Sequence, residues 1–200
     1  MSERLQDCLH ARLRAATAAE HDGLERDLDW QARVASLDSY RGLLARLRGF
    51  HAAYEPAIGR ALGDDAFFGP RRRLARLDAD LSYLGLDAAG IAALPAPPPV
   101  VLQDRAEALG ALYVLEGSTL GGQVIARQIE RLHGLSETGG CAYYRAHGRA
   151  AAAMWAAFRA ELETLAGDPA AEAAALGTGI ATFAAMRRWL VPATGAQDAA

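Results

Sequence analysis

The sequence predicts an all-α, single-domain protein. Apolar residues recur at three- and four-residue intervals along most of the chain, and no segment alternates apolar and polar residues as a half-buried strand would. The 200 residues, of which 52% are hydrophobic, are enough for one core and too few for two large domains. We therefore expect a multi-helix bundle over residues 1–191 and a small, polar, flexible tail over residues 192–200.

Three helices are predicted in the first half of the chain. Apolar positions repeat at helical spacing through Leu28. A second apolar face runs from Tyr40 to Leu62 after the capping candidates of residues 36–39, with Pro56 as an expected kink. A third face covers residues 74–84. The prolines of residues 95–99 then indicate a stiff connector, too short to separate two domains.

The second half predicts three more helices. Residues 105–132 are typical of a long helix, with a glycine-rich interruption at residues 117–122. Gly139 and Gly140 open a loop, and another helix follows over about residues 149–165. Asp168 and Pro169 start the last one, because Asp caps a helix and Pro suits its first position.

Charge and cysteine content exclude several classes of function. The formal net charge of −3, in which every basic residue is Arg, gives no reason to expect nucleic-acid or membrane binding. Cys8 and Cys141 have no paired spacing, which argues against a disulfide framework or a thiolate zinc site. Residues 1–13 do not resemble a signal peptide, and no apolar run reaches membrane-spanning length, so we expect a cytoplasmic protein.

Three glycines inside the long helix of residues 105–132 are the most informative feature. Gly117, Gly121 and Gly122 together give up about 3 kcal/mol of helix propensity relative to Ala. Either a neighbouring helix packs closely on Gly117 and Gly121, or a flat ligand lies against the bare backbone. A phosphate-binding loop is disfavoured, because no strand precedes the segment and no Gly-Lys-Ser/Thr follows it.

Four of the five histidines have structural explanations. His133 lies beside Gly134 at a predicted helix end, where a cation suits the helix dipole. His10, His51 and His147 lie among polar residues, and we expect them to be solvated.

The fifth histidine, His21, has a ligand-like setting. Arg14 precedes it by two helical turns on the same face, and Glu25 follows by one turn. A carboxylate at that spacing can accept from the imidazole and fix its tautomer, as metal-ligating histidines require. A solvent-exposed helical histidine is the alternative.

These segments together resemble the haem oxygenases, especially their bacterial, biliverdin-producing, phytochrome-associated branch. Residues 13–17 followed by Glu20-His21 are similar to the family's proximal helix, and residues 113–118 with 121–124 are similar to its distal helix. The aromatic residues at 143–144, 155, 158 and 183 resemble its C-terminal pattern. The family fold implied is a bundle in which haem is sandwiched between the proximal helix and a kinked distal helix.

The resemblance also implies an activity and its partners. The protein would use O₂ and a reductant to cleave haem to biliverdin, CO and free iron. Electrons would come from a ferredoxin or a flavoprotein reductase, and a bacteriophytochrome is a possible acceptor of the biliverdin. Haem would be both substrate and cofactor, since its own iron carries the oxidation.

Individual residues then take roles by resemblance. His21 would bind the iron axially and leave the opposite face open for O₂, with Glu25 orienting the imidazole. Arg14 would bind a haem propionate, whereas Arg145 and Arg149 are possible but unplaced. The remaining residues implied in the site are Tyr113 and Phe183 against the haem, and Gly117, Ser118, Gly121 and Gly122 over its distal face.

One residue departs from the family pattern. Many members have Asp directly after the first distal glycine, where it holds the water that delivers protons, and this chain has Ser118. A hydroxyl can anchor water but carries no charge, so the sequence does not identify the route of proton delivery. A haem carrier or sensor without turnover is one alternative function.

A di-iron oxygenase is the other alternative. Glu130 and His133 have the Glu-x-x-His spacing of di-iron bundles, and His51 and Glu55 lie one turn apart. Only one such unit occurs where two are required, which disfavours this alternative.

Overall fold

A computed structural model describes residues 8–191, and the regular structure within that range is helical. This confirms the all-α prediction, while the tail expected over residues 192–200 lies outside the described residues. The main helices are α2 (Leu9–Leu28), α4 (Leu37–Leu62), α6 (Leu74–Tyr83), α8 (Arg105–His133), α9 (Ala151–Leu162) and α10 (Pro169–Leu190). The short ones are α3 (Trp30–Arg33), α5 (Asp65–Phe68), α7 (Ala88–Ala92) and the 3₁₀ turns η1 (Gly69–Arg71), η2 (Gly148–Ala150) and η3 (Glu163–Leu165).

The predicted capping residues begin the helices. The Ser36 hydroxyl accepts from the Ser39 backbone N–H and starts α4, which then continues through Pro56 to Leu62. The Asp168 carboxylate accepts two backbone N–H groups at the start of α10, with Pro169 in the first position. These side chains satisfy donors that a helix start leaves without partners.

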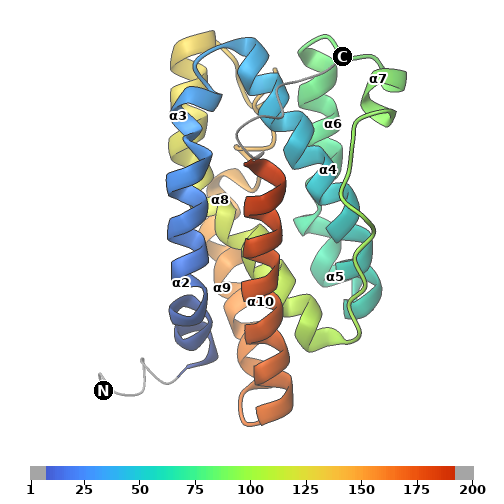
Figure 1. Cartoon of the computed structure of the whole chain (residues 1–200), viewed down its shortest axis with the longest axis vertical. Coiled ribbons are helices and arrows are strands. Elements are labelled where there is room, and N and C mark those ends of the chain that lie inside the picture. Colours follow the sequence, from blue (N-terminus) through green and yellow to red (C-terminus); the bar gives the residue numbers. More distant parts are fainter. Residues whose placement is uncertain (1–7, 192–200) are drawn as a thin grey trace.

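Helix α10 packs against both α8 and α2 (Figure 1). The approach is close because glycines lie at both contacts. A Cβ atom on Gly110 of α8 would come within 2.3 Å of the Ala175 carbonyl oxygen in α10. A Cβ on Gly179 of α10 would come within 2.8 Å of the Leu13 side chain in α2. Close contact at these glycines, with backbone at Gly110 and with a side chain at Gly179, fixes the positions of the three helices relative to one another.

The long helix α8 is not interrupted at its glycines. Backbone helix continues from Arg105 to His133, so the predicted break at residues 117–122 is wrong. In Figure 1 the halves of α8 before and after the glycines run in different directions. The helix therefore bends while keeping its hydrogen bonds, because a low-propensity segment inside a long helix can still be held by packing at both ends.

The proline-rich connector lies along the bundle. Residues 95–103 have no regular secondary structure, and Figure 1 shows the segment running beside α4 from α7 to the start of α8. A Cβ on Gly49 would come within 2.3 Å of the Pro95 carbonyl oxygen, so the connector packs directly against α4. None of the helices within residues 8–191 is long and apolar enough to cross a membrane.

Candidate functional site

A cavity of about 820 Å³ opens between α2, α8 and α10. Its size lies in the range of ligand-binding sites. Leu24 and Leu28 of α2, Ile125 of α8 and Met186 of α10 give it an apolar wall. All nine predicted site residues line this one cavity: Arg14, His21, Glu25, Tyr113, Gly117, Ser118, Gly121, Gly122 and Phe183.

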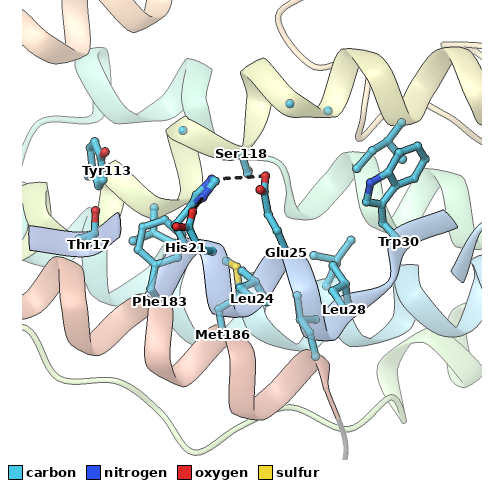
Figure 2. Close-up of a pocket in the computed structure, with 18 of the residues that line it drawn as sticks. Thr17, His21, Leu24, Glu25, Leu28, Trp30, Tyr113, Ser118, Phe183 and Met186 are labelled. Atoms are coloured by element: carbon cyan, nitrogen blue, oxygen red, sulfur yellow. Dashed lines mark ion pairs between the residues drawn. The ribbon is translucent and has the colours of Figure 1, made fainter. Parts of the chain in front are cut away.

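His21 projects from α2 toward α8 (Figure 2). Its side chain is 48% exposed, so the imidazole is open to a ligand entering the cavity. The ring packs edge-on against Phe183 of α10, with 5.7 Å between ring centroids. Two carboxylates face it: Glu25 Oε1 lies 3.6 Å from Nε2, and Asp22 Oδ1 lies 3.5 Å from Nδ1. Asp22, which was not among the predicted site residues, is therefore the carboxylate closer to Nδ1.

These three residues are also the one group among the described residues whose side chains could together hold a metal ion. All three are exposed. An imidazole flanked by two carboxylates is a donor set that suits iron.

Gly117 and Gly121 leave open space on the α8 side of the cavity. Beyond its chain neighbours and the adjoining backbone of α8, a Cβ atom at either position would meet no atom of the described residues within 4 Å. Neither glycine packs against a neighbouring helix, so the helix-contact explanation is wrong for both. Gly122 differs, since its Cβ would lie 3.4 Å from the Tyr144 ring. Two of the three glycines thus present bare backbone to the cavity, which is the arrangement a flat ligand needs.

Aromatic residues and one arginine surround the other end of the cavity. Tyr113 lies 5.9 Å from Trp155 between ring centroids, and His10 packs edge-on against the same tryptophan. Burial raises the pKa of Tyr113, and a hydrogen bond with Thr17 opposes that rise. Arg14 is exposed and lines the cavity from α2, so it can bind a carboxylate there.

The other candidate arginines lie elsewhere. Arg145 donates to both carboxylate oxygens of Glu130 and to the Gln123 side chain, so it is already paired. Arg149 lies in η2 and does not line the cavity. Of the three arginines considered for a propionate, only Arg14 is positioned for it.

The sequence predicts solvated side chains for three histidines, and this is wrong. His10 is half-buried in the cavity wall, the His147 side chain is 5% exposed, and His51 is fully buried. Burial lowers the pKa of His51 and, together with the charge of Arg73, lowers that of His147 to about 4. Both are therefore neutral at pH 7. His133 does end α8, and its Nε2 lies 2.8 Å from the Val34 carbonyl oxygen.

His51 belongs to a buried chain of polar groups. Its Nδ1 lies 2.8 Å from Glu55 Oε1, and its Nε2 lies 3.1 Å from the Tyr143 hydroxyl. The same Glu55 oxygen accepts the backbone N–H groups of Arg73 and Leu74. Burial raises the pKa of Glu55, but the hydrogen bond to His51 and the other donors outweigh it and lower the pKa overall. These groups satisfy one another and are not available as di-iron ligands.

Glu130, the other half of the di-iron hypothesis, is paired with Arg145. The two Glu/His pairs thus do not combine into a carboxylate-bridged site, and the one group of described residues whose side chains could together hold a metal ion is the one around His21. The di-iron alternative is therefore wrong.

Ser118 is backed by a buried arginine that the sequence argument missed. Arg73 Nη2 donates to Ser118 Oγ at 3.1 Å and to the Leu115 carbonyl oxygen. Ser118 itself donates to the Leu115 oxygen at 2.7 Å. Arg73 lies in the run Arg71-Arg72-Arg73, and a run of like charges is usually solvated, so no local signal predicts that its first and last members are buried.

Comparisons with known proteins agree with this geometry. A family model described as Heme oxygenase matches residues 7–191. A heme oxygenase of Xanthomonas campestris pv. campestris (strain 8004) is 39% identical over 154 residues, which cover 74% of this chain and 86% of that protein.

Two solved structures share the fold. The NO- and CO-bound heme oxygenase of Neisseria meningitidis is 22% identical, with a TM-score of 0.73 and 96% of each chain covered. The heme oxygenase of Leptospira interrogans is 17% identical, with a TM-score of 0.75 and coverage of 93% of this chain and all of the other.

Proposed function

Since this chain belongs to the haem oxygenase family, we propose that its cavity holds haem between His21 of α2 and the glycine-bearing face of α8. The reaction is the oxidation of haem to biliverdin with release of CO and iron, driven by O₂ and a reductant. The observation that carries the proposal is the open space at Gly117 and Gly121 in the same cavity as a half-exposed histidine.

The residues of the cavity fit haem chemically. The apolar walls suit the porphyrin faces, and the imidazole of His21 suits the iron. When bound, haem supplies the iron at which O₂ is reduced and is itself the molecule oxidised. The protein contributes binding, orientation and exclusion of water from the apolar faces.

On the proximal side, His21 Nε2 is the proposed iron ligand. Glu25 faces this nitrogen, so its carboxylate must move aside when the iron binds. Asp22 can then stay where it is and accept the Nδ1–H, which fixes the ligating tautomer. We therefore assign Asp22 a share of the orienting role that resemblance gives to Glu25 alone.

On the distal side, Gly117, Ser118, Gly121 and Gly122 form the wall over the haem. The bare backbone at Gly117 and Gly121 leaves room for a haem face to lie close to α8, so these residues would limit the space for O₂ on that side. Phe183 supports the imidazole from α10. Arg14 binds a propionate, and Tyr113 lies in the same part of the cavity.

The reaction also requires a source of electrons and an outlet for the product. We propose a ferredoxin or a flavoprotein reductase as electron donor, and a bacteriophytochrome as one acceptor of biliverdin. A cytoplasmic location suits both, because reduced electron carriers of these classes are kept there.

Haemin titration of the purified protein tests the ligand assignment. We expect the Soret band of a histidine-ligated complex, lost or shifted in His21→Ala and unchanged in the control His133→Ala, whose ring lies at the far end of α8. Adding an electron donor and O₂ should convert the Soret band to the broad absorption of biliverdin. An unaltered spectrum in His21→Ala would refute the ligand, and a haem band that persists with reductant and O₂ would indicate a carrier instead.

A further inference from the structure

Arg73 is a buried cation without a carboxylate partner. It is 2% exposed, and no Asp or Glu of residues 8–191 forms an ion pair with its guanidinium. Its contacts are the Leu115 carbonyl oxygen, the Ser118 hydroxyl and the face of Tyr143, whose ring centroid lies 4.8 Å from Cζ. All of these partners are uncharged. Because arginine keeps its charge in almost any environment, a positive charge remains at this point of the core.

Arg71, two residues earlier, does have a carboxylate within ion-pair distance, although its Nε makes no hydrogen bond within the described residues. It is also buried, and its Nε lies 3.6 Å from the buried carboxylate of Glu116. The two arginines share one short segment, yet only Arg71 has a carboxylate within ion-pair distance of its guanidinium, because Glu55 contacts Arg73 at the backbone N–H. Burying an unpaired charge is costly, so Arg73 calls for an explanation that Arg71 does not.

Two carboxylates, those of Glu55 and Glu116, interact electrostatically with Arg73 without pairing with its guanidinium. Glu55 is bound to His51 and to backbone N–H groups. Glu116 faces Arg71 and His147, and burial raises its pKa, an effect that the charges of Arg73 and Arg71 oppose. His147 is neutral at pH 7 and adds no charge. These groups reduce the field of Arg73 without pairing with its guanidinium.

The Ser118 hydroxyl connects Arg73 to the cavity. Ser118 is exposed and lines the cavity, and it accepts from Arg73 while donating to Leu115. Its proton is therefore already committed, and the hydroxyl offers the cavity only a lone pair. The main effect of this part of the wall on a bound haem would be the positive electrostatic potential of Arg73, which is stronger where the dielectric constant is low.

We propose that Arg73 is the fixed positive charge of the distal wall, and that it favours negatively charged over neutral ligands at the haem iron. The proposal rests on haem binding between His21 and α8. The chain thus places a cation behind Ser118, where many relatives have a carboxylate facing the haem. Arg73 is a positioning residue in this scheme, because it acts through its field and through Ser118 without touching the ligand.

Azide binding to the ferric haemin complex, followed by absorbance, tests this directly. Arg73→Met and Arg73→Gln should weaken azide binding roughly tenfold or more, from the loss of a unit charge at short range. The affinity of the ferrous complex for CO, a neutral ligand, should change less than twofold. Arg73→Lys should restore most of the azide affinity. The matched control is Arg71→Gln, a buried arginine of the same segment that does not contact Ser118, for which we expect a smaller change in azide affinity.

Ser118→Ala separates charge from hydrogen bonding. It removes the hydroxyl and keeps Arg73, so azide affinity should fall less than threefold. A loss equal to that of Arg73→Met would show that the hydroxyl acts and the charge does not, which overturns the proposal. Equal weakening of azide and CO binding in Arg73→Met would also overturn it, because that pattern indicates a packing defect.

Stability provides a second readout. Burying a charge that no carboxylate contacts is costly, and Arg73→Met removes that cost, so the haem-free Arg73→Met protein should melt at or above the parent temperature. If both the Met and the Gln variant fail to fold, Arg73 is structural and the proposal is wrong. Failure of the parent protein to form a histidine-ligated haemin complex would instead refute the proposed function, and the two failures are thereby distinguished.

Discussion

The substitution Gly117→Ala should stabilise the haem-free protein and weaken its binding of haem. Beyond the adjoining part of α8 itself, no atom of the described residues lies within 4 Å of the added Cβ, so the substitution meets no steric resistance. Glycine inside a helix is less favourable than alanine by about 0.8 to 1 kcal/mol. We therefore expect the free energy of unfolding to rise by about 0.5 to 1 kcal/mol, and the melting temperature by about 2 °C for a chain of this size.

Gly110→Ala is the matched control in the same helix. It gains the same helix propensity, but its Cβ would lie 2.3 Å from the Ala175 carbonyl oxygen, a backbone atom that cannot rotate away. Overpacking of this kind costs about 1 to 3 kcal/mol, so the net effect is a loss of stability. The two alanines should therefore shift the melting temperature in opposite directions.

Thermal unfolding followed by circular dichroism, with and without haemin, measures both effects. In Gly117→Ala the methyl group occupies space assigned to haem, so haemin should bind more weakly and raise the melting temperature less than in the parent. A fall in melting temperature comparable to that of Gly110→Ala would show that Gly117 is a packing residue. If Gly117→Ala is more stable and still binds and oxidises haem normally, the proposal that haem lies against this face of α8 is wrong.

Three further variants test the scaffold around the cavity. The Asp80 carboxylate accepts two backbone N–H hydrogen bonds of 2.8 Å from the segment that carries Tyr143. Asp80→Asn should therefore lower the free energy of unfolding, measured in urea, by about 2 kcal/mol, whereas the control Asp78→Asn, at a half-exposed side chain, should lower it by less than about 0.5 kcal/mol. Neutral His147, whose pKa burial lowers to about 4 against an unfolded value near 6.5, contributes stability that is complete above pH 6.5 and lost as pH falls toward 4. His147→Asn, which tolerates the local φ of 66°, should flatten that part of the stability profile by about 3 kcal/mol. An unchanged slope would contradict the burial argument. Ser36→Ala should cost about 1 kcal/mol through loss of the cap, and a change in haemin affinity beyond twofold would contradict its purely structural role.

The main helices and the cavity residues are predictable from sequence because their signals are local. Apolar spacing, and capping residues such as Ser36 and Asp168, can be recognised within the sequence of a single helix. The pairing of His21 with the distal glycines is not local, and resemblance to a family supplied it. The short helices α3, α5 and α7 were not predicted, since four or five residues are too few to show a period.

His51 was misjudged although a signal existed. It lies one turn after Leu47 and two turns before Ile58, on the same apolar face of α4. Its polar neighbours in sequence are not its neighbours in space, and Glu55 one turn later supplies the acceptor that makes its burial possible. Position on the helix face was a better guide to burial than the polarity of adjacent residues.

Arg73 and Gly110 had no such signal. The partners of Arg73 lie more than 40 positions away on α8, and the atom that Gly110 approaches lies 65 positions away on α10. Whether a glycine faces a neighbouring helix or an open cavity depends on where that second helix lies. For this reason Gly110 and Gly117, seven residues apart, look alike in sequence and serve different purposes.

The features that destabilise this fold converge on one place. Gly117 and Gly121 give up helix propensity without packing against a neighbouring helix. Arg73, whose guanidinium pairs with no carboxylate of residues 8–191, is buried against Ser118 of the same segment. Packing contacts of α10 with α2 and α8, made at Gly110 and Gly179, hold the helices in place despite these costs. The residues at the helix contacts thus stabilise the fold, whereas the glycines and the buried charge at the cavity destabilise it. Selection for folding alone would not retain such destabilising residues at one site. A bound ligand that fills the space at the glycines and brings negative charge toward Arg73 removes both costs at once. Haem whose iron carries an anionic ligand has both properties.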